Sequence, residues 1–465
     1  MLTRHALTRR NVAASRRLAT AAAAVEPAPV RRRPTSSLTS ELSSLKSSLF
    51  HLLGSSHPSL DAVAKYYFQA EGKHLRPMLV LLMAQATNGL GGEGWDRMRA
   101  RQAEDEASGR GVDHSLTSVE GVLNDWNPEQ MGMEGEADLV FAEPYLVGTA
   151  AQQTSQQRST PSPPPPSAPT DETPILSTQR RLASITEMIH VASLLHDDVI
   201  DNSPLRRGSP SAPQQFSNKL SILAGDFLLG RASVALARLG SREVVELLAT
   251  VIANLVEGEV MQMRAQPQQA STATAAAAAA TGPSAEAFEI YMRKTYLKTA
   301  SLMAKSARAS VILGGCGTPD GGDVGMSASE IAEGEVVKDI AYAYGRNLGI
   351  AFQLIDDLLD FLPPSPTLGK PGLGADLSLG LTTAPVLYAW RANPALGPLI
   401  QRKYSLPGDV QLARELVGKT DGLARTRELA VKFAGEARRA VERLPESQAR
   451  DELVQLTEKV VQRVA

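Results

Sequence analysis

The sequence predicts an all-α protein, and three observations lead to this prediction. Long segments repeat apolar residues every three or four positions, as one buried face of a helix requires. No segment shows the sustained alternation of apolar and polar residues that a half-buried strand produces. The helical segments also follow one another without a composition shift that would separate domains. We therefore expect one helical core.

The helical segments can be placed along the chain. The first begins at Pro77, because proline suits the first position of a helix. Another ends at Asp201, because Asn202-Ser203-Pro204 follows directly. In order, the predicted helices cover residues 77–87, 179–201, 217–239, 242–263, 288–313, 330–361 and 383–390, followed by helical pieces from 410 to the C-terminus.

Two stretches lack helical periodicity and are predicted to be insertions. Residues 91–173 are rich in Gly, Glu, Gln, Ser and Pro, so they bury too little apolar surface to offset the entropy of ordering, and we expect them to be mostly disordered. Residues 266–284 form an Ala/Thr/Gln tract without a large apolar residue, which favours a surface loop. The Gly-rich stretch 314–325 is predicted to be a turn.

Composition excludes several classes of protein. The chain has 465 residues, 43% hydrophobic, which is enough for a large core. Its net charge of -2 gives no reason to expect binding to nucleic acid. The single cysteine, Cys316, excludes an intramolecular disulfide and suits a reducing compartment. No apolar run approaches the length of about 18 residues that a membrane-spanning helix needs.

The N-terminus has the composition of an organelle transit peptide. Residues 1–25 contain no acidic residue, while five arginines alternate with Ala, Leu, Ser and Thr. We predict mitochondrial import, with residues 1–35 removed before about Ser36 and residues 36–465 forming the mature catalytic domain. The alternative is an ordinary disordered tail.

Two aspartate motifs indicate chemistry. DDVID at 197–201 and DDLLD at 356–360 each stand at the end of a predicted helix. Asp197 and Asp201 project from one helix face, as do Asp356 and Asp360. Like charges at this spacing repel by a few tenths of a kcal/mol, and the negative end of the helix dipole adds a similar penalty. Both motifs therefore need an external cation, and Mg²⁺ is the natural candidate because it takes carboxylate and phosphate oxygens.

Cationic and polar side chains near these motifs could bind phosphate groups. Some follow or precede the motifs in sequence, and one lies in a flexible loop. Others lie at the start of a helix, where the helix dipole and the free N–H groups attract anions. His190 and Gln353 share a helix face with the aspartates that follow them. The candidates are Lys73, Arg76, His190, Arg206, Arg207, Lys298, Thr299, Gln353 and Lys370. Such a set of donors, together with metal-binding acids, is what binding two diphosphates requires. Salt bridges to the aspartates are the alternative interpretation for the two arginines.

Five ordered motifs give the chain a family resemblance. They read GKHLRP, DDVIDNSPLRRG, KTA, FQLIDDLLD and GKPGLGADL. In this order they resemble the trans-polyprenyl diphosphate synthases, most closely the long-chain mitochondrial members that make the ubiquinone side chain. The resemblance runs from about Glu41 to the C-terminus, without the two insertions. It implies the isoprenoid-synthase helical bundle around a central cavity, and a homodimer.

The resemblance also implies a role for each matching residue. Asp197, Asp201, Asp356 and Asp360 resemble the Mg²⁺ ligands. Arg206, Lys298, Thr299, Gln353 and Lys370 resemble residues that hold the allylic diphosphate, and Lys73, Arg76, His190 and Arg207 those that hold isopentenyl diphosphate. Asp198 and Asp357 point about a hundred degrees away around the helix and are weaker candidates. The usual Gly-Gly-Lys is Glu71-Gly72-Lys73 here, a departure that the two cations Lys73 and Arg76 outweigh.

The implied reaction adds isopentenyl diphosphate to farnesyl or geranylgeranyl diphosphate, with Mg²⁺ stabilising the diphosphate that leaves. Ala192 and Ser193 stand where short-chain relatives carry aromatic residues, so we expect a long product. His196 is open to two interpretations, one catalytic and one as a packing residue.

The alternatives for the whole chain are a geranylgeranyl diphosphate synthase and a non-catalytic subunit of a heteromeric synthase. Because the product is hydrophobic, we also expect peripheral association with the inner mitochondrial membrane, on the matrix side.

Overall fold

The computed structural model describes residues 57–69, 74–108, 174–206, 208–264, 282–317, 325–362 and 374–463, with a few further positions at 41–53, 111, 112 and 116. The chain divides into two units, residues 1–41 and 42–465, and all the elements named below belong to the second. In the described ranges the structure is all-α apart from one two-stranded hairpin, which confirms the predicted fold class.

The elements follow the predicted segments closely. In chain order they are α3 (Pro58–Gln69), α4 (Leu75–Thr87), α5 (Glu93–Ala107), α7 (Ser177–Ile200), β1 (Leu205–Arg206), β2 (Ser209–Pro210), α8 (Ala212–Gln215), α9 (Asn218–Arg238), α10 (Arg242–Arg264), α12 (Ala285–Thr295), the π-helical turn η2 (Tyr296–Ala300), α13 (Ser301–Leu313), α14 (Ala328–Leu359), α15 (Ala375–Ser378), α16 (Ala384–Ala392), α17 (Leu396–Gln401), α18 (Asp409–Gly418), α19 (Gly422–Val441) and α20 (Gln448–Gln462).

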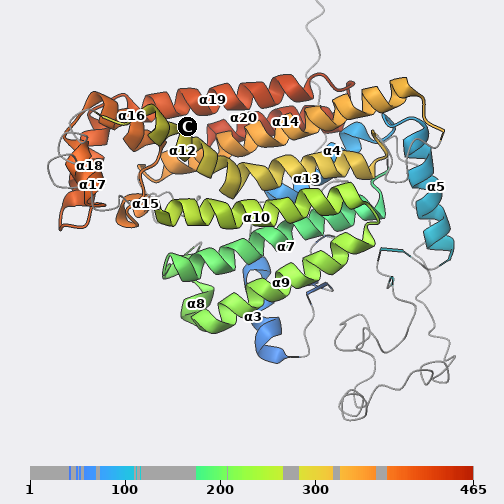
Figure 1. The fold of residues 1–465 in the computed structure, drawn as a ribbon, viewed down its shortest axis with the longest axis horizontal. Coiled ribbons are helices and arrows are strands. Elements are labelled where there is room, and N and C mark those ends of the chain that lie inside the picture. Colours follow the sequence, from blue (N-terminus) through green and yellow to red (C-terminus); the bar gives the residue numbers. More distant parts are fainter. Residues whose placement is uncertain are drawn as a thin grey trace, which may run out of the picture. The chain divides into compact units, whose positions relative to one another are not determined.

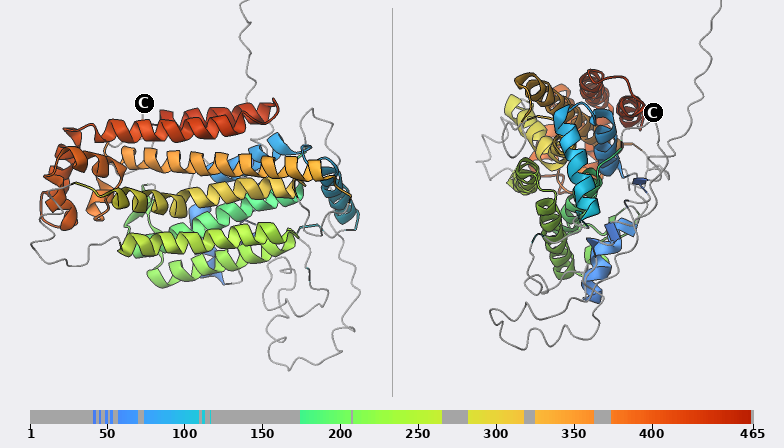
Figure 2. Two further views of the ribbon diagram at one scale, coloured as in Figure 1. Left: turned by 45° about the horizontal axis from the view of Figure 1, so that its top comes forward. Right: turned by 90° about the vertical axis from the view of Figure 1, so that its right-hand side faces the viewer.

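The long helices run roughly alongside one another. α14 packs against α13 and α19, while α7 packs against α9 and α4, and α10 lies against α13 and η2 (Figures 1 and 2). The short helices α15 to α18 gather at one end of this bundle, and α5 lies at the other end (Figure 1). The two longest helices, α7 and α14, therefore carry their last turns, and with them the two aspartate motifs, toward the end where the short helices are.

Local sequence explains where the two motif-bearing helices begin. At the start of α14, the Ser327 hydroxyl accepts the N–H of Glu330, and the Glu330 carboxylate accepts the N–H of Ser327 at 2.8 Å. This capping box satisfies two N–H groups that the first helical turn leaves without partners. At the start of α7, the Gln179 side chain accepts the N–H of Leu176 at 3.0 Å.

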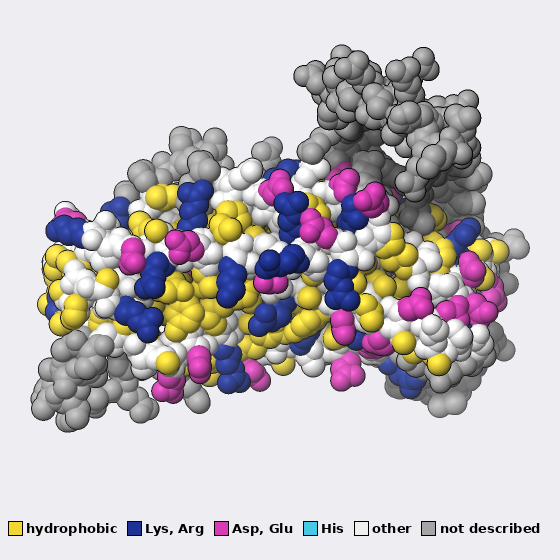
Figure 3. Space-filling view, turned by 90° about the horizontal axis from the view of Figure 1, so that it is seen from above, with side chains coloured by type: hydrophobic (Ala, Val, Ile, Leu, Met, Phe, Trp, Pro, Cys, Tyr) yellow, Lys and Arg dark blue, Asp and Glu magenta, His cyan; other side chains and the backbone are white. Residues whose placement is uncertain are grey.

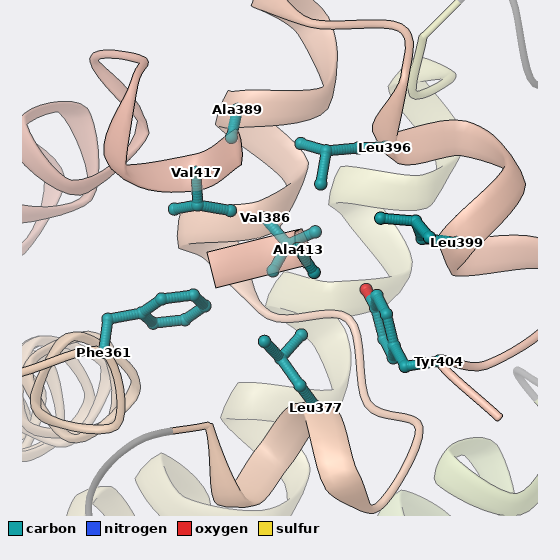
Figure 4. Packing of buried hydrophobic residues seen from close by; sticks show 9 residues of the cluster. All are labelled: Phe361, Leu377, Val386, Ala389, Leu396, Leu399, Tyr404, Ala413 and Val417. Atoms are coloured by element: carbon teal, nitrogen blue, oxygen red, sulfur yellow. The ribbon is translucent and has the colours of Figure 1, made fainter. Parts of the chain in front are cut away.

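A separate apolar cluster fixes the end of α14. Phe361, directly after the second motif, is buried with Leu377 of α15, Val386 of α16 and Val417 of α18 (Figure 4). Burying each of these side chains stabilises the fold by about 1.5–3 kcal/mol. The cluster therefore anchors the end of the second motif to the short helices.

The surface over α19 and α20 carries mixed charge. Figure 3 shows Lys and Arg side chains interspersed with Asp and Glu on this face. The Arg438 guanidinium, for example, lies 2.7 Å from Glu442 and 3.3 Å from Glu458. Exposed pairs of this kind contribute little stability, and they give a well-solvated face.

Three expectations need correction. Residues 93–107, inside the predicted insertion 91–173, form α5, because Trp95 is buried at 6% exposure and anchors a helix that is otherwise mostly polar. The short elements α3, α8, α15 and α17 and the hairpin were not predicted. By length and composition alone α9 could span a membrane, so the expectation that no segment is long enough is wrong, although α9 packs on α7 within the bundle. Residues 1–35, 117–173 and 266–281 lie outside the described residues.

The buried hydroxyl of Tyr344 offers a test of how α20 is held. It donates to the carbonyl oxygen of Leu453 at 2.8 Å, which joins α14 to α20. Tyr344→Phe should lower the free energy of unfolding by about 1 kcal/mol, because one buried hydrogen bond is lost. Urea unfolding followed by circular dichroism measures this. Tyr342→Phe is the control, since the Tyr342 hydroxyl pairs with the Tyr296 hydroxyl in a contact that is only partly buried. Equal stability of the two variants would contradict the assigned role of the Tyr344 hydroxyl.

Candidate active site

The first motif occupies the last turn of α7. Asp197 and Asp198 lie in the helix and Asp201 is its C-cap, with its N–H donating to the Asp197 carbonyl at 2.8 Å. Asn202 then adopts a left-handed conformation (φ 51°) that ends the helix. His196 faces α9, where its Nε2 lies 3.2 Å from the Ile222 carbonyl oxygen. This contact favours a packing role for His196.

The second motif ends α14 in the same way, with Asp360 as the C-cap. The Asp360 carboxylate accepts the N–H groups of Ala375 and Asp376 at 2.9 and 3.1 Å, so it caps the start of α15. Asp356 forms an ion pair with Arg463 at 3.0 Å. Metal binding by Asp356 and Asp360 stays a prediction, and Asp360 would bind a metal only in addition to, or in place of, its contacts with α15.

The turn η2 packs against α10 and against α14, the helix that carries the second motif. The Lys298 ammonium binds the carboxylate of Glu259 and lies 3.3 Å from the amide oxygen of Gln262, both on α10. The Thr299 hydroxyl donates to the Gln353 amide oxygen of α14 at 2.7 Å. Consecutive residues thus bond to different helices, Lys298 to α10 and Thr299 to α14, and Lys298 also acts electrostatically on Asp197 of the first motif. Such π-helical turns are rare and are often found at functional sites.

Glycine is required where α10 approaches this turn. A Cβ added at Gly258 would lie 2.6 Å from Lys298 Cγ and 3.2 Å from Leu297 Cβ. A larger residue would therefore push η2 away from α10. The neighbouring Glu259 is 6% exposed, which makes its pair with Lys298 a buried one.

Negative charge around the first motif is not fully balanced by the protein. Burial is the main cause that raises the pKa of Asp197 to about 7; Lys298 opposes this, while Glu259 and Asp201 add to it. Burial likewise raises the pKa of Asp201, again opposed by Lys298. A carboxylate with a raised pKa is one that lacks favourable positive charge. A divalent cation bound here would supply that charge.

The described residues do not provide a complete metal cage by themselves. Among the described residues, no three or more His, Cys, Asp or Glu side chains are grouped closely enough to hold a metal ion. Two carboxylates with substrate phosphate oxygens as further ligands is the usual arrangement for Mg²⁺. The donor set of the first motif fits that arrangement.

Arg206 is presented by the short hairpin after α7. β1 pairs with β2 in an antiparallel register that places Arg206 opposite Ser209, and Gly208 (φ 81°) provides the left-handed conformation of the turn. The Arg206 Nε lies 2.9 and 2.8 Å from the two carboxylate oxygens of Asp198. The Asp198 carboxylate is fully buried, so this pair fixes the guanidinium firmly.

A pocket of about 240 Å³ lies beside this arginine. Its lining includes Arg206, His190 and Tyr67, together with His74 and Glu187, which lie 3.5 Å apart. His190 and Arg206, both predicted diphosphate donors, therefore line one pocket. Arg76 is the second residue of α4, at a helix start as predicted.

Most of the predicted residues gather at two places. Asp197, Asp201, Lys298, Thr299 and Gln353 lie around η2, and His190 and Arg206 lie around the pocket. Lys73, Arg207 and Lys370 lie outside the described residues.

Sequence reasoning missed four residues that contact this machinery. Glu259 pairs with Lys298, Arg463 pairs with Asp356, and two tyrosines, Tyr67 and Tyr291, hydrogen-bond to the middle aspartates. Only Glu259 carries a signal in the sequence, as an acid on an otherwise apolar helix face near Gly258. The other three come from helices distant in sequence and follow no local pattern.

A helical bundle that carries two aspartate motifs at helix ends, with lysine, arginine, threonine and glutamine donors near them, is the architecture of enzymes that act on prenyl diphosphates. A family model described as polyprenyl synthetase matches residues 168–417. The chain belongs to the polyprenyl synthetase family and is a trans-prenyltransferase.

Individual relatives are similar over nearly the whole chain. It is 46% identical to the probable mitochondrial hexaprenyl pyrophosphate synthase of Neurospora crassa, over 92% of this chain and 81% of that protein. It is 37% identical to the mitochondrial hexaprenyl pyrophosphate synthase of Saccharomyces cerevisiae, over 94% and 92%.

Solved structures agree on the fold. A decaprenyl diphosphate synthase from Rhodobacter capsulatus matches with a TM-score of 0.60 at 27% identity, over 92% of this chain and 97% of that one. A polyprenyl synthase from Caulobacter crescentus, complexed with calcium and isoprenyl diphosphate, matches with a TM-score of 0.60 at 26% identity, over 92% and 96%.

The raised pKa of Asp197 predicts how the metal-free protein responds to pH. An aspartate whose pKa is higher in the folded state binds its proton more tightly there, so stability falls as pH rises from about 4 to 7. Asp197→Asn removes this loss. The difference in free energy of unfolding between the variant and the wild type should therefore favour the variant by on the order of 2 kcal/mol more at pH 8 than at pH 5. This follows because each unit of difference between the folded and unfolded pKa corresponds to about 1.36 kcal/mol. Urea unfolding in EDTA measures the difference. If the stability difference between variant and wild type did not change with pH, the pKa of Asp197 would not be raised in the folded protein.

Proposed function

We propose that this enzyme condenses isopentenyl diphosphate units head to tail onto farnesyl or geranylgeranyl diphosphate and makes a long-chain trans-polyprenyl diphosphate for the ubiquinone side chain. The observation that carries the proposal is that Lys298, which acts electrostatically on Asp197 of the first motif, is followed directly by Thr299, which hydrogen-bonds to Gln353 beside the second motif. The names of the similar hexaprenyl and decaprenyl synthases support a long product.

Mg²⁺ is the proposed cofactor. The calcium and isoprenyl diphosphate in the Caulobacter structure support a divalent cation beside a diphosphate. Asp197 and Asp201 would hold one side of the metal site, and Asp356, with Asp360, the other. When bound, Mg²⁺ supplies the positive charge that stabilises the diphosphate as a leaving group.

The remaining residues position the two substrates. Lys298, Thr299, Gln353, Arg206 and Lys370 are proposed to hold the allylic diphosphate, through charge-assisted or neutral hydrogen bonds. Lys73, Arg76, His190 and Arg207 are proposed to hold isopentenyl diphosphate. The shared pocket supports placing His190 and Arg206 close to both substrates.

The chemistry then needs no side-chain nucleophile. As the allylic carbon–oxygen bond breaks, negative charge grows on the diphosphate, and the Lys298 ammonium and Arg206 guanidinium stabilise it. The double bond of isopentenyl diphosphate attacks the allylic carbon. The departing diphosphate takes one proton from the new cation, which gives a product that is five carbons longer.

Removal of the leading aspartates tests the metal assignment. Asp197→Ala and Asp356→Ala should each lower kcat by two or more orders of magnitude. Without these ligands the protein would no longer hold the Mg²⁺ whose positive charge stabilises the leaving group. Incorporation of radiolabelled isopentenyl diphosphate measures this, and circular dichroism checks that helix content is retained. Near-normal activity in either variant would refute the metal assignment.

Product length is proposed to depend on the small residues before the first motif. Ala192 is fully buried, and Ser193 donates its hydroxyl to the His190 carbonyl at 2.8 Å. Neither side chain carries the bulk that would block an apolar tail running down between the helices.

Ala192→Phe should therefore shorten the product by several isoprene units, because its ring fills the space into which the tail grows. Reverse-phase chromatography of the dephosphorylated products reads out the length. Ala183→Phe, at a buried position of α7 about two and a half helical turns earlier, controls for overpacking of a core helix, which costs about 1–3 kcal/mol. A variant of Ala192 that folds and makes the wild-type product would contradict the proposed path of the tail.

Two other functions are tested by the same assay. A geranylgeranyl diphosphate synthase would stop at twenty carbons by the definition of its product. A non-catalytic subunit of a heteromeric synthase is the second, and a similar protein in Schizosaccharomyces pombe, 38% identical, is named decaprenyl-diphosphate synthase subunit 1. The retention of all six motif aspartates favours an active chain. Activity of the purified chain alone, with Mg²⁺ and farnesyl and isopentenyl diphosphates, separates the three.

A homodimer and a mitochondrial location are also proposed. α9 and α10 expose large apolar side chains, among them Ile222, Leu223 and Val234 on α9 and Val256 and Met263 on α10. Exposed apolar surface of this kind marks interfaces, and a second copy would cover it. The mitochondrial names of the relatives support import through residues 1–35. Peripheral contact with the inner membrane on the matrix side remains part of the proposal.

A further inference from the structure

We propose that the middle aspartate of each motif, Asp198 or Asp357, is a positioning residue that a tyrosine hydroxyl from another helix clamps against a diphosphate-binding side chain. The proposal rests on the proposed function for the roles of Arg206 and Gln353. It assigns positioning roles to Tyr67 and Tyr291, two residues outside every sequence motif.

In the first motif, three helices and a hairpin meet at Asp198. The Tyr67 hydroxyl of α3 donates to one Asp198 oxygen and accepts the N–H of Ala212, the first residue of α8, at 2.8 Å. The same carboxylate receives the Arg206 Nε at 2.9 and 2.8 Å. The Arg206 guanidinium carbon also lies 6.0 Å from the Tyr67 ring centroid, within range of a cation–π interaction.

In the second motif, Asp357 occupies the equivalent place. The Tyr291 hydroxyl of α12 donates to one Asp357 oxygen at 2.6 Å, and the Gln353 amide nitrogen donates to the other at 2.8 Å. Gln353 then accepts the Thr299 hydroxyl with its amide oxygen at 2.7 Å. The two motifs therefore share one arrangement, although the tyrosines come from helices more than 200 positions apart in sequence.

Burial and geometry favour positioning over metal binding. Asp198 and Asp357 are 0% and 2% exposed, and both oxygens of each carboxylate already accept hydrogen bonds from the protein. A hydrated Mg²⁺ ion needs accessible oxygens, since it gives up its water reluctantly. Asp197 and Asp201, which keep partial exposure, are better placed for that role.

The clamp determines which donors face the substrate. Arg206 uses Nε and one terminal nitrogen on Asp198, which leaves its other terminal N–H groups at the pocket that it lines. Gln353 uses one amide hydrogen on Asp357 and its oxygen on Thr299, so its amide orientation is fixed and its second hydrogen can reach a diphosphate. Preorganised donors of this kind cost no reorganisation when the substrate binds.

The test compares tyrosine variants that lose only a hydroxyl. Tyr67→Phe and Tyr291→Phe are each measured for the KM of farnesyl diphosphate, for kcat, and for the Mg²⁺ concentration of half-maximal activity. Calorimetric binding of the unreactive analogue farnesyl thiodiphosphate, with Mg²⁺ present, gives a readout that is independent of turnover. Tyr344→Phe is the matched control, because it also loses a buried tyrosine hydrogen bond, between α14 and α20.

We expect each clamp variant to raise the KM and the analogue Kd roughly tenfold, the loss of one hydrogen bond to a charged group. The Mg²⁺ requirement should stay within about twofold of the wild type, whereas a lost metal ligand would raise it. Tyr344→Phe should lose stability and leave both constants unchanged.

Aspartate variants complete the cycle. Asp198→Asn and Asp357→Asn should raise the KM in the same way, and Tyr67→Phe should add little to Asp198→Asn, because coupled residues are not additive. Asp201→Asn should instead raise the Mg²⁺ requirement. The inference is overturned if the tyrosine variants match Tyr344→Phe, or if Asp198→Asn and Asp357→Asn shift the Mg²⁺ requirement as Asp201→Asn does. A wild type that neither binds the analogue nor turns over would overturn the proposed function and the inference with it.

Discussion

Repulsion between carboxylates at two helix ends is the constraint on which this structure depends. Each motif places three aspartates where a helix dipole is already negative, and burial makes the charge more costly still. The fold responds by bringing Lys298, Arg206 and Arg463 to these ends from a π-helical turn, a hairpin and the last helix. Bound divalent cations would balance the remaining negative charge of the carboxylates and also that of a diphosphate between them.

Helix geometry explains why the aspartates of one motif have different surroundings. Residues four apart share a face, and the second aspartate of the motif points elsewhere. In both motifs that middle aspartate points into the protein, where it meets a tyrosine and a side chain that is proposed to bind diphosphate. The aspartates of one motif thus experience different surroundings, although they are the same type of residue.

Sequence reasoning reached the helices and the motifs because both are local properties. Periodicity located α7, α9, α10 and α14 within a few residues of their ends, and the two motifs were visible directly. The π-helical form of 296–300 could not be read from the sequence, because it depends on how closely α10 and α14 approach that turn. α5 was missed for a related reason: a single buried tryptophan holds a helix whose remaining composition resembles a loop.

The contacts that complete the site arise from tertiary packing, which no local pattern records. Tyr67 and Arg463 belong to α3 and to the cap of α20, near the two extremes of the described chain. A nascent polypeptide that still lacks its final helix cannot yet bring the Arg463 guanidinium to Asp356, however well its earlier helices have formed. The charge balance around Asp356 is therefore complete only once α20 has packed against the bundle.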